Sequence, residues 1–315
     1  MATAREVKQR IKSVKNISHI TRAMQAVSAS KVQRAIQALE ATRPYASKAW
    51  EVLTHLALQP GRANMHPLLA SREKVNKVMV VLITADRGLA GPYNTNVLRL
   101  AFRRFGHFEA PVEFVTLGRK GRDILYRRGM KVVADFSPVP DPPTFVDISP
   151  VGRLVVDAFL TGQADEVYVV YTDFINMLRQ EPRIKKLLPL EVEEGGEQVM
   201  EYRLARAAGP APAYIYEPNE QEILDEVVPR FTQLQIFQAV LESRASEHAA
   251  RMVAMKNATD NATELAAALQ LEYNKARQQS ITSEMLDIAG GAEALAQALA
   301  QAKAQAEAAE KEKAS

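Results

Sequence analysis

The stretch that decides the fold reads ARMVAMKNATDN at residues 250–261 and YNKARQQSITSE at residues 273–284. Both segments belong to one helical pattern that runs from about Glu217 toward the C-terminus. No proline follows Pro229, and the next glycine is Gly290. At about 1.5 Å per residue, a helix from residue 230 to residue 290 is roughly 90 Å long. A compact domain needs no helix of that length, so this helix requires a partner along its side or a distant target.

Apolar residues along this helix recur at intervals of three and four, which is the spacing of one helical face. They are Val228, Phe231, Leu234, Phe237, Val240 or Leu241, Ala245, Ala249, Met252, Met255, Ala262, Leu265, Leu269, Tyr273 and Ala276. Polar residues then take over at Arg277, Gln278, Thr282, Glu284 and Asp287. One explanation is that the helix has left its partner here and is exposed to solvent on all sides. The other is that these polar side chains form hydrogen bonds and ion pairs with a surrounding protein. The pattern alone does not separate these two explanations.

Residues 1–58 predict a second long helix. Its apolar residues also step by three or four, as Val7, Ile11, Val14, Ile17, Ile20, Met24 and Val27. Pro44 either kinks this helix or costs it one hydrogen bond, and Gln59-Pro60-Gly61 ends it. We expect the two terminal helices to pack against each other as an antiparallel coiled coil.

The region between the helices changes period. Apolar, β-branched runs at Val78–Thr84, Pro111–Leu117, 131–136 and Glu166–Tyr171 predict buried strands. Helical stretches at 94–105, 119–128 and 146–161 alternate with them, and residues 138–143 form a proline-rich loop. This alternation predicts a mostly parallel sheet that helices cover on both faces. Gly195-Gly196 suggests a β-hairpin, and residues 205–213 have the composition of a linker.

The expected fold is therefore α/β, with a long antiparallel coiled coil of N- and C-terminal helices and an inserted Rossmann-like α/β domain. We expect an N-terminal helix at 1–58, the α/β domain at 75–205 and the C-terminal coiled-coil helix at 214–291. An Ala-rich tail at 292–315, either helical or disordered, follows; we favour a short helix with a disordered finish because its helix propensity is high.

Composition excludes several classes of function. The formal charge of +3 on 315 residues does not indicate general binding of polyanions. The absence of cysteine excludes disulfides, thiol chemistry and thiolate metal sites. No apolar run is long enough to span a membrane, and the first residues do not resemble a secretory signal. The five histidines show no metal-ligand spacing.

The sheet region invites a dinucleotide-binding interpretation, which its turns do not support. The turn after the first strand reads TADRGLAGPYN at residues 84–94, which is not G-x-G-x-x-G. Gly118 and Gly121 supply only G-x-x-G after the second strand. We therefore interpret these residues as turn glycines of a scaffold. Asp86 and Arg87 lie where ligands often bind, but no third catalytic partner is identifiable. We expect neither a cofactor nor a catalytic site.

Residues 1–40 carry eight Lys or Arg against Glu6 and Glu40, a local net charge of +6. DNA contact, an acidic protein partner and a solvated helix face are the three interpretations. Few aromatic residues accompany these cations, which disfavours nucleic acid as a partner.

Four segments resemble the gamma subunit of the F-type ATP synthase. They are ITRAMQAVSASK at 20–31, TADRGLAG at 84–91, ARMVAMKNATDN at 250–261 and YNKARQQSITSE at 273–284. The resemblance spans roughly residues 2–291. It implies a rotor shaft without its own active site, whose terminal helices occupy the bore of a hexamer of three alpha and three beta subunits. It also implies contacts with the epsilon subunit and the membrane c-ring, a delta subunit in the whole complex, and a place at the cytoplasmic face of a bacterial membrane.

The resemblance further implies a set of contacts with the beta subunit. Arg22, Met24 and Lys31 match the segment that faces beta's acidic lever, and the Arg87–Ala90 loop matches a second contact with that lever. Arg251 and Lys256 match a basic helical segment, and Arg277, Gln278, Thr282 and Glu284 match polar contacts to a beta loop.

The chain departs from the family at three places. The 84–94 loop has Ala90 and Pro92 where the family commonly carries Cys and a second Gly. The cysteine-bearing insertion of chloroplast members is absent, and residues 292–315 extend past the usual end. Two other classes stay open: a coiled-coil tethering or DNA-binding protein, for which salt-sensitive duplex binding would be the sign, and an α/β enzyme, for which the sign would be nucleotide binding by the isolated chain.

Overall fold

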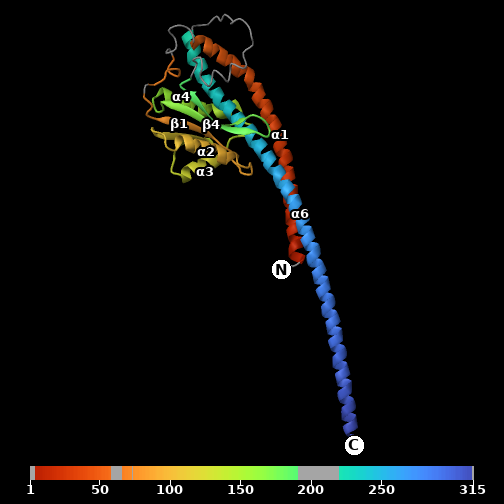
Figure 1. The fold of residues 1–315 in the computed structure, drawn as a ribbon. Helices are drawn as coiled ribbons and strands as arrows, with labels where there is room; N and C mark the ends of the chain where they lie inside the picture. The colour runs from red at the N-terminus through yellow and green to blue at the C-terminus, as the bar shows by residue number, and fades with distance from the viewer. Residues whose placement is uncertain (1–3, 58–65, 73, 191–219, 314–315) are drawn as a thin grey trace. The chain divides into compact units, whose positions relative to one another are not determined.

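The computed structural model describes residues 4–57, 66–72, 74–190 and 220–313 (Figure 1). It divides into two compact units. One unit comprises Met1–Ala23 and Lys256–Ser315, and the other comprises Met24–Met255.

The larger unit is built on a five-stranded sheet. Its strands are β1 (Val78–Ile83), β2 (Val112–Leu117), β3 (Lys131–Asp135), β4 (Glu166–Phe174) and β5 (Gln180–Leu188). They lie in the order β3-β2-β1-β4-β5. The first four strands run parallel, and β5 is antiparallel to β4. Every residue of β1 is buried, as expected for the central strand of a parallel sheet covered on both sides.

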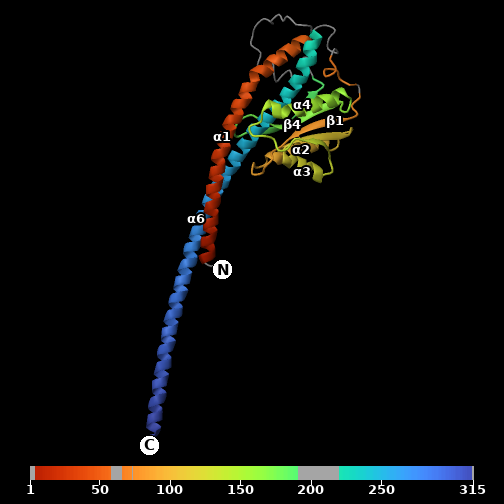
Figure 2. The same cartoon turned by 180° about the vertical axis from the view of Figure 1, so that it is seen from behind.

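Helices cover both faces of this sheet, as the alternating sequence pattern predicts. α2 (Tyr93–Phe105) and α3 (Arg119–Arg127) pack on the face formed by Val78, Val80 and Leu82. α4 (Phe145–Leu160) packs on the opposite face with Met79, Val81 and Ile83. Figures 1 and 2 show this layering from opposite sides. A capping box between Thr144 and Asp147 begins α4.

The sequence pattern did not predict β5. Its sequence, QEPRIKKLL, is mostly polar and contains Pro182, because β5 is an edge strand whose outer side has no partner strand to bond. The β-hairpin expected at Gly195-Gly196 and the linker expected at 205–213 lie outside the described residues.

Two long helices complete the described part of the chain: α1 (Ala4–Ala57) and α6 (Glu220–Lys313). α1 stays helical through Pro44. Within the larger unit the two helices lie side by side against the α4 face of the sheet (Figure 2). Trp50 of α1 meets Phe231 of α6 with ring centroids 5.5 Å apart, and Leu39, Leu53 and Leu234 belong to the same core.

The smaller unit pairs the first part of α1 with α6 in an antiparallel seam. The hydroxyls of Thr21 and Thr259 lie 2.6 Å apart, and those of Ser18 and Thr263 lie 3.4 Å apart. Val7 and Ile11 are buried nearer the start of α1. The expected antiparallel pairing is thus present, although this part of the seam is rich in hydroxyl groups.

The buried face of α1 differs from the stripe expected from the sequence. Ile17, Ile20 and Val27 are exposed, whereas Thr21 is buried. An α-helix turns by about 100° per residue, so Ile20 lies roughly 140° around the helix from Val7, and Thr21 only about 40°. Steps of three in succession therefore leave the seam, and alternating steps of four and three follow it. In this part of α1, the polarity of a side chain does not indicate whether it lies in the seam.

α6 continues past the end of its partner helix. Every described residue from Arg277 to Gln297 is exposed. The helix passes without a break through Gly290 and Gly291 and ends at Lys313. None of the helices in the described ranges has a segment apolar enough to cross a membrane.

Candidate partner-binding site

The loop that follows β1 packs against α6 within the larger unit. Ala90 is buried with Ala85 and Tyr93, and the side chain of Ala250 from α6 packs on them. Gly91 approaches α6 so closely that a Cβ atom there would lie 3.8 Å from the Cβ of Ala254. The tip of the loop, Arg87 to Leu89, is exposed. The loop therefore presents its tip outward on an apolar base.

A buried arginine joins this loop to α6. Arg244 donates from Nη1 to Glu247 (2.7 Å) and from Nη2 to the carbonyl of Val139 (2.7 Å) and to Asp86 (3.3 Å). Burial opposes the positive charge most strongly, but the attraction and hydrogen bond of Glu247, with Tyr93 and Asp86 nearby, together outweigh it and raise the pKa of Arg244. The guanidinium is thus charged and uses several donors in one fixed geometry.

Arg251 and His248 extend the same cluster. Arg251 donates to Glu247 (2.7 Å) and to the carbonyl of Gly88 (3.3 Å), and its Nη1 lies 3.3 Å from His248 Nδ1. Since a guanidinium can only donate, Nδ1 of His248 accepts, and we assign the ring proton to Nε2. That nitrogen lies 3.4 Å from Asp141.

Asp141 brings α1 into the cluster. Lys31 of α1 donates to its second carboxylate oxygen over 2.7 Å. The hydrogen bonds from His248 and then Lys31 outweigh burial and hold the pKa of Asp141 well below its usual range. A carboxylate on the loop after β3 therefore bonds to both long helices.

The structure gathers several predicted contact residues and separates others. Lys31, the Arg87–Ala90 loop and Arg251 meet around this cluster. The Ala90 side chain faces α6 and is only 2% exposed, so the loop offers Arg87 rather than Ala90 to a partner. Met24 is half-buried in the larger unit. The remaining predicted residues are exposed in the smaller unit: Arg22, Lys256, Arg277, Gln278, Thr282 and Glu284.

The sequence reasoning missed Arg244, Glu247, His248 and Asp141. The first three, followed by Arg251, recur on α6 at intervals of three, one and three, so they share one helical face. A stripe of charge on an otherwise apolar helix was the available signal. Asp141 gave no signal because its partners lie far away in the sequence.

The edge where a doubly wound sheet usually binds a nucleotide is filled by the chain itself. The hydroxyl of Thr84 accepts the Gly121 N–H (2.9 Å) and donates to the Gly118 carbonyl (3.0 Å). Asp86 accepts the Arg119 N–H (3.2 Å). The first amides of α3 are thus already bonded, which leaves them unable to cradle a phosphate. The turn interpretation holds for Gly118, which has a φ of 106° and precedes α3. It is wrong for Gly121, which lies inside α3 and packs against Thr84.

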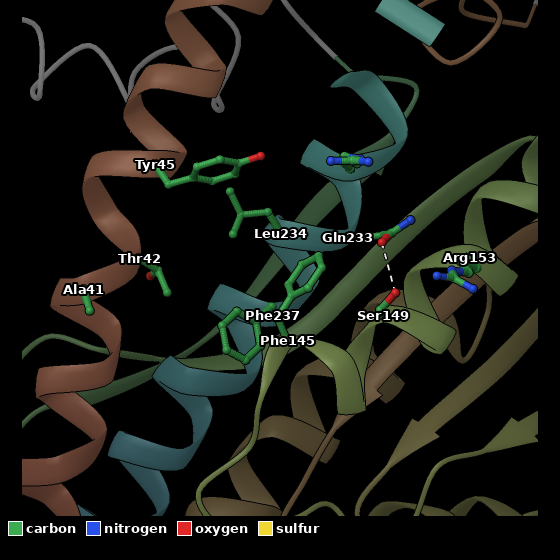
Figure 3. Close-up of a pocket in the computed structure, with 10 residues that line it drawn as sticks. Ala41, Thr42, Tyr45, Phe145, Ser149, Arg153, Gln233, Leu234 and Phe237 are labelled. Atoms are coloured by element: carbon green, nitrogen blue, oxygen red, sulfur yellow. Dashed lines mark hydrogen bonds between the residues drawn. The ribbon is translucent and has the colours of Figure 1, made fainter. Parts of the chain in front are cut away.

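An open cavity of about 520 Å³ lies between α1, α4 and α6 (Figure 3). Its wall is largely aromatic and aliphatic, with Tyr45, Phe145, Leu234 and Phe237. Ser149 bonds to Gln233 over 3.2 Å, so neither is activated by a base. Across the described parts of the chain, no group of His, Asp or Glu is arranged to hold a metal ion.

Comparison with known proteins identifies the family. The ATP synthase family model matches residues 3–295. The gamma chain of Roseiflexus sp. (strain RS-1) is 44% identical over 300 residues, covering 94% of this chain and 99% of that protein. The chain belongs to the ATP synthase gamma chain family. The gamma chain of Dehalococcoides mccartyi (strain CBDB1) is 43% identical over 298 residues, covering 94% of this chain and all of that protein.

Chains in solved ATP synthase structures share the fold. A chain of the Euglena gracilis mitochondrial ATP synthase (OSCP/F1/c-ring, rotational state 3) matches with a TM-score of 0.60 and 21% identity, covering 93% of this chain and 94% of that chain. A chain of the Tetrahymena thermophila central stalk and c-ring matches with a TM-score of 0.53 and 23% identity, covering 76% of this chain and 99% of that chain.

Proposed function

We propose that this chain is the central rotor shaft of an F-type ATP synthase and carries no catalytic site of its own. The observation that carries this proposal is the exposed part of α6. From Arg277 to Gln297 every described residue is exposed, and Ile281, Met285 and Ile288 are among them. Apolar residues at alternating steps of four and three on an uncovered helix require a surrounding surface. A bore lined by other subunits supplies one.

The mechanism follows from the asymmetry of such a shaft. Each orientation of the shaft presents different side chains to a given beta subunit. A beta conformation that fits one orientation is stabilised by the difference in contact energy, and its nucleotide affinity shifts with it. Rotation driven by protons at the c-ring then drives the beta subunits through their states in turn. The chain couples ATP synthesis to proton flow without touching the nucleotide.

Two surfaces carry this role. Around the cluster, the exposed tip at Arg87 and the partly exposed Lys31 are suited to an acidic lever of beta. On the distal helix, Arg277 and Gln278 offer donors to a beta loop. The Thr282 hydroxyl already bonds the carbonyl of Gln278 (2.9 Å), and Glu284 accepts from Ser280 (3.3 Å), so both side chains are held in place.

The proposal also specifies partners and location. Three alpha and three beta subunits surround one copy of this chain, and epsilon and the c-ring meet the α/β domain, with delta in the whole complex. The assembly is peripheral on the cytoplasmic face of a bacterial membrane, and nucleic acid is not a partner.

The test is reconstitution with the alpha and beta subunits of the same organism. We expect one copy of the chain to co-purify with three of each.

We expect Arg277→Ala with Gln278→Ala to lower ATPase turnover roughly tenfold, since about 1.4 kcal/mol of lost contact energy is a factor of ten. Gln297→Ala with Gln301→Ala on the same helix serves as the matched control. Full activity in the first variant would remove the distal contact from the proposal, and failure to co-purify would overturn the proposal itself.

A further inference from the structure

Three segments that are distant in the sequence converge on one face of α6. They are the loop after β1, through Asp86 and Gly88; the loop after β3, through Val139 and Asp141; and α1, through Lys31. α6 meets the two loops with Arg244, His248 and Arg251, while Glu247 holds both arginines. Lys31 of α1 joins the group through Asp141. We call these side chains, with Lys31, Asp86 and Asp141, the ionic cluster.

The ionic cluster is balanced and largely withdrawn from water. Its cations are Lys31, Arg244 and Arg251, and its anions are Asp86, Asp141 and Glu247. The side chains of Arg244 and Glu247 at its centre are 8% and 5% exposed. His248 adds one contact to Asp141 through Nε2 and one to Arg251 through Nδ1.

Stability alone does not account for such a cluster. Buried ion pairs roughly break even with well-packed apolar residues, because desolvation offsets their attraction. What they add is direction, since charge-assisted hydrogen bonds tolerate little change in angle. Apolar burial is non-directional and sets no comparable limit on the angle between two elements. The cluster therefore fixes the orientation of the attached loops more than it strengthens their attachment.

We propose that Arg244 and Glu247 are positioning residues that clamp the Arg87-bearing loop to α6. This inference rests on the proposed function. When α6 turns, the clamp makes the loop turn with it, so that force from beta on Arg87 is transmitted to the helix. Without the clamp the loop yields, and ATP hydrolysis is no longer matched by proton transport.

The first test breaks the clamp in the whole ATP synthase. Arg244→Gln removes the charge, and Arg244→Lys keeps the charge but cannot reproduce the fork that reaches Glu247, Val139 and Asp86. We expect protons pumped per ATP hydrolysed to fall at least threefold in Arg244→Gln, with Arg244→Lys intermediate. The control is Arg230→Gln on the same helix, whose exposed pair with Glu226 lies outside the cluster. If Arg244→Gln does not fold, Asp86→Asn weakens the clamp from the loop side.

A disulfide provides the decisive rescue. Gly91→Cys with Ala254→Cys places two Cβ atoms about 3.8 Å apart, a typical separation for a disulfide. The chain has no other cysteine, so this pair alone can form within it. Gly91 has a φ of +55°, so its substitution lowers the free energy of unfolding by about 1–2 kcal/mol. We expect the chain that retains Arg244 to tolerate this loss. Oxidation should leave coupling unchanged when Arg244 is present and restore most of it in Arg244→Gln, and dithiothreitol should reverse the rescue.

The outcomes separate the clamp from the shaft. Full coupling in Arg244→Gln, or lost coupling that the disulfide does not restore, overturns the clamp while leaving the shaft intact. Hydrogen exchange in the free chain tests the clamp without any partner. Amides of residues 86–91 should exchange at least tenfold faster in Arg244→Gln and slow again on oxidation, and unchanged exchange overturns the clamp. Failure of the unaltered chain to assemble with alpha and beta overturns the shaft instead.

Discussion

Gly118 has a φ of 106°, and a Cβ atom there would lie 2.1 Å from the carbonyl oxygen of Thr84. The backbone cannot yield without breaking the hydrogen bonds of Thr84 at the end of β1. We therefore expect Gly118→Ala to lower the free energy of unfolding by about 3 kcal/mol or more. Gly129→Ala is the matched control, because Gly129 also has positive φ but has open space around it. Denaturant unfolding should show a cost of only about 1–2 kcal/mol there. Equal costs at the two glycines would contradict the steric argument.

His66 predicts a dependence of stability on pH. Its Nδ1 accepts the Leu68 N–H over 3.1 Å, and burial lowers its pKa below 6.5, although Asp225 opposes the shift. The unfolded chain therefore binds a proton more readily than the native chain does, so stability falls as the pH drops below about 6.5 and levels off below the native pKa.

The check compares denaturant unfolding at about pH 7.5 and pH 5 for the unaltered chain and His66→Asn. Asparagine can accept the same N–H but does not titrate. We expect a smaller loss of stability on acidification in His66→Asn. The same loss in both chains would show that His66 does not control this window.

At the scale of elements, the seam between α1 and α6 in the larger unit depends on a few large side chains. Trp50 and Phe231 are 6% and 1% exposed, so either change to alanine leaves a cavity. We expect Phe231→Ala to cost about 3–5 kcal/mol in the free energy of unfolding. Tyr45→Ala on the same stretch of α1 changes an exposed side chain and should cost less than about 0.5 kcal/mol. A small loss for Phe231→Ala in thermal unfolding would mean that the seam is not part of the cooperative core.

The elements differ in how far the sequence could predict them. The apolar runs of β1 and β4 and the helices between them were predictable because each buries a continuous face. β5 was not predictable, because its sequence, QEPRIKKLL, contains Pro182 and does not alternate polar and apolar residues. The register of the seam was also missed, because Thr21 and Thr259 satisfy each other and hide their burial from a hydrophobic pattern.

The candidate site was less predictable than the fold. Arg251 and Lys31 were reached only through resemblance to the family. The partners that hold them, Glu247 and Asp141, become visible only when distant segments meet. Pairing between charges far apart in sequence leaves no local period to detect.

At the scale of the whole molecule, two successive parts of α6, residues 266–291 and residues 292–315, differ in how much they stabilise the chain. Residues 292–299, 301 and 302 are all exposed, so truncation after Gly291 should leave the stability of the free chain unchanged. Truncation after Leu265 also removes Leu269, Tyr273 and Ala276, which are half-buried in the smaller unit. We expect amide exchange around Val7 and Ile11 to accelerate only in the shorter chain. Acceleration in both chains would show that the tail contributes to the seam.

The filled edge of the sheet has a thermodynamic consequence. A protein that binds a ligand in its native state is stabilised in proportion to the logarithm of the ligand concentration. Thr84 and Asp86 already use the groups through which such binding would occur at this edge. Binding of ATP or ADP at this edge therefore contributes nothing to the free energy of unfolding.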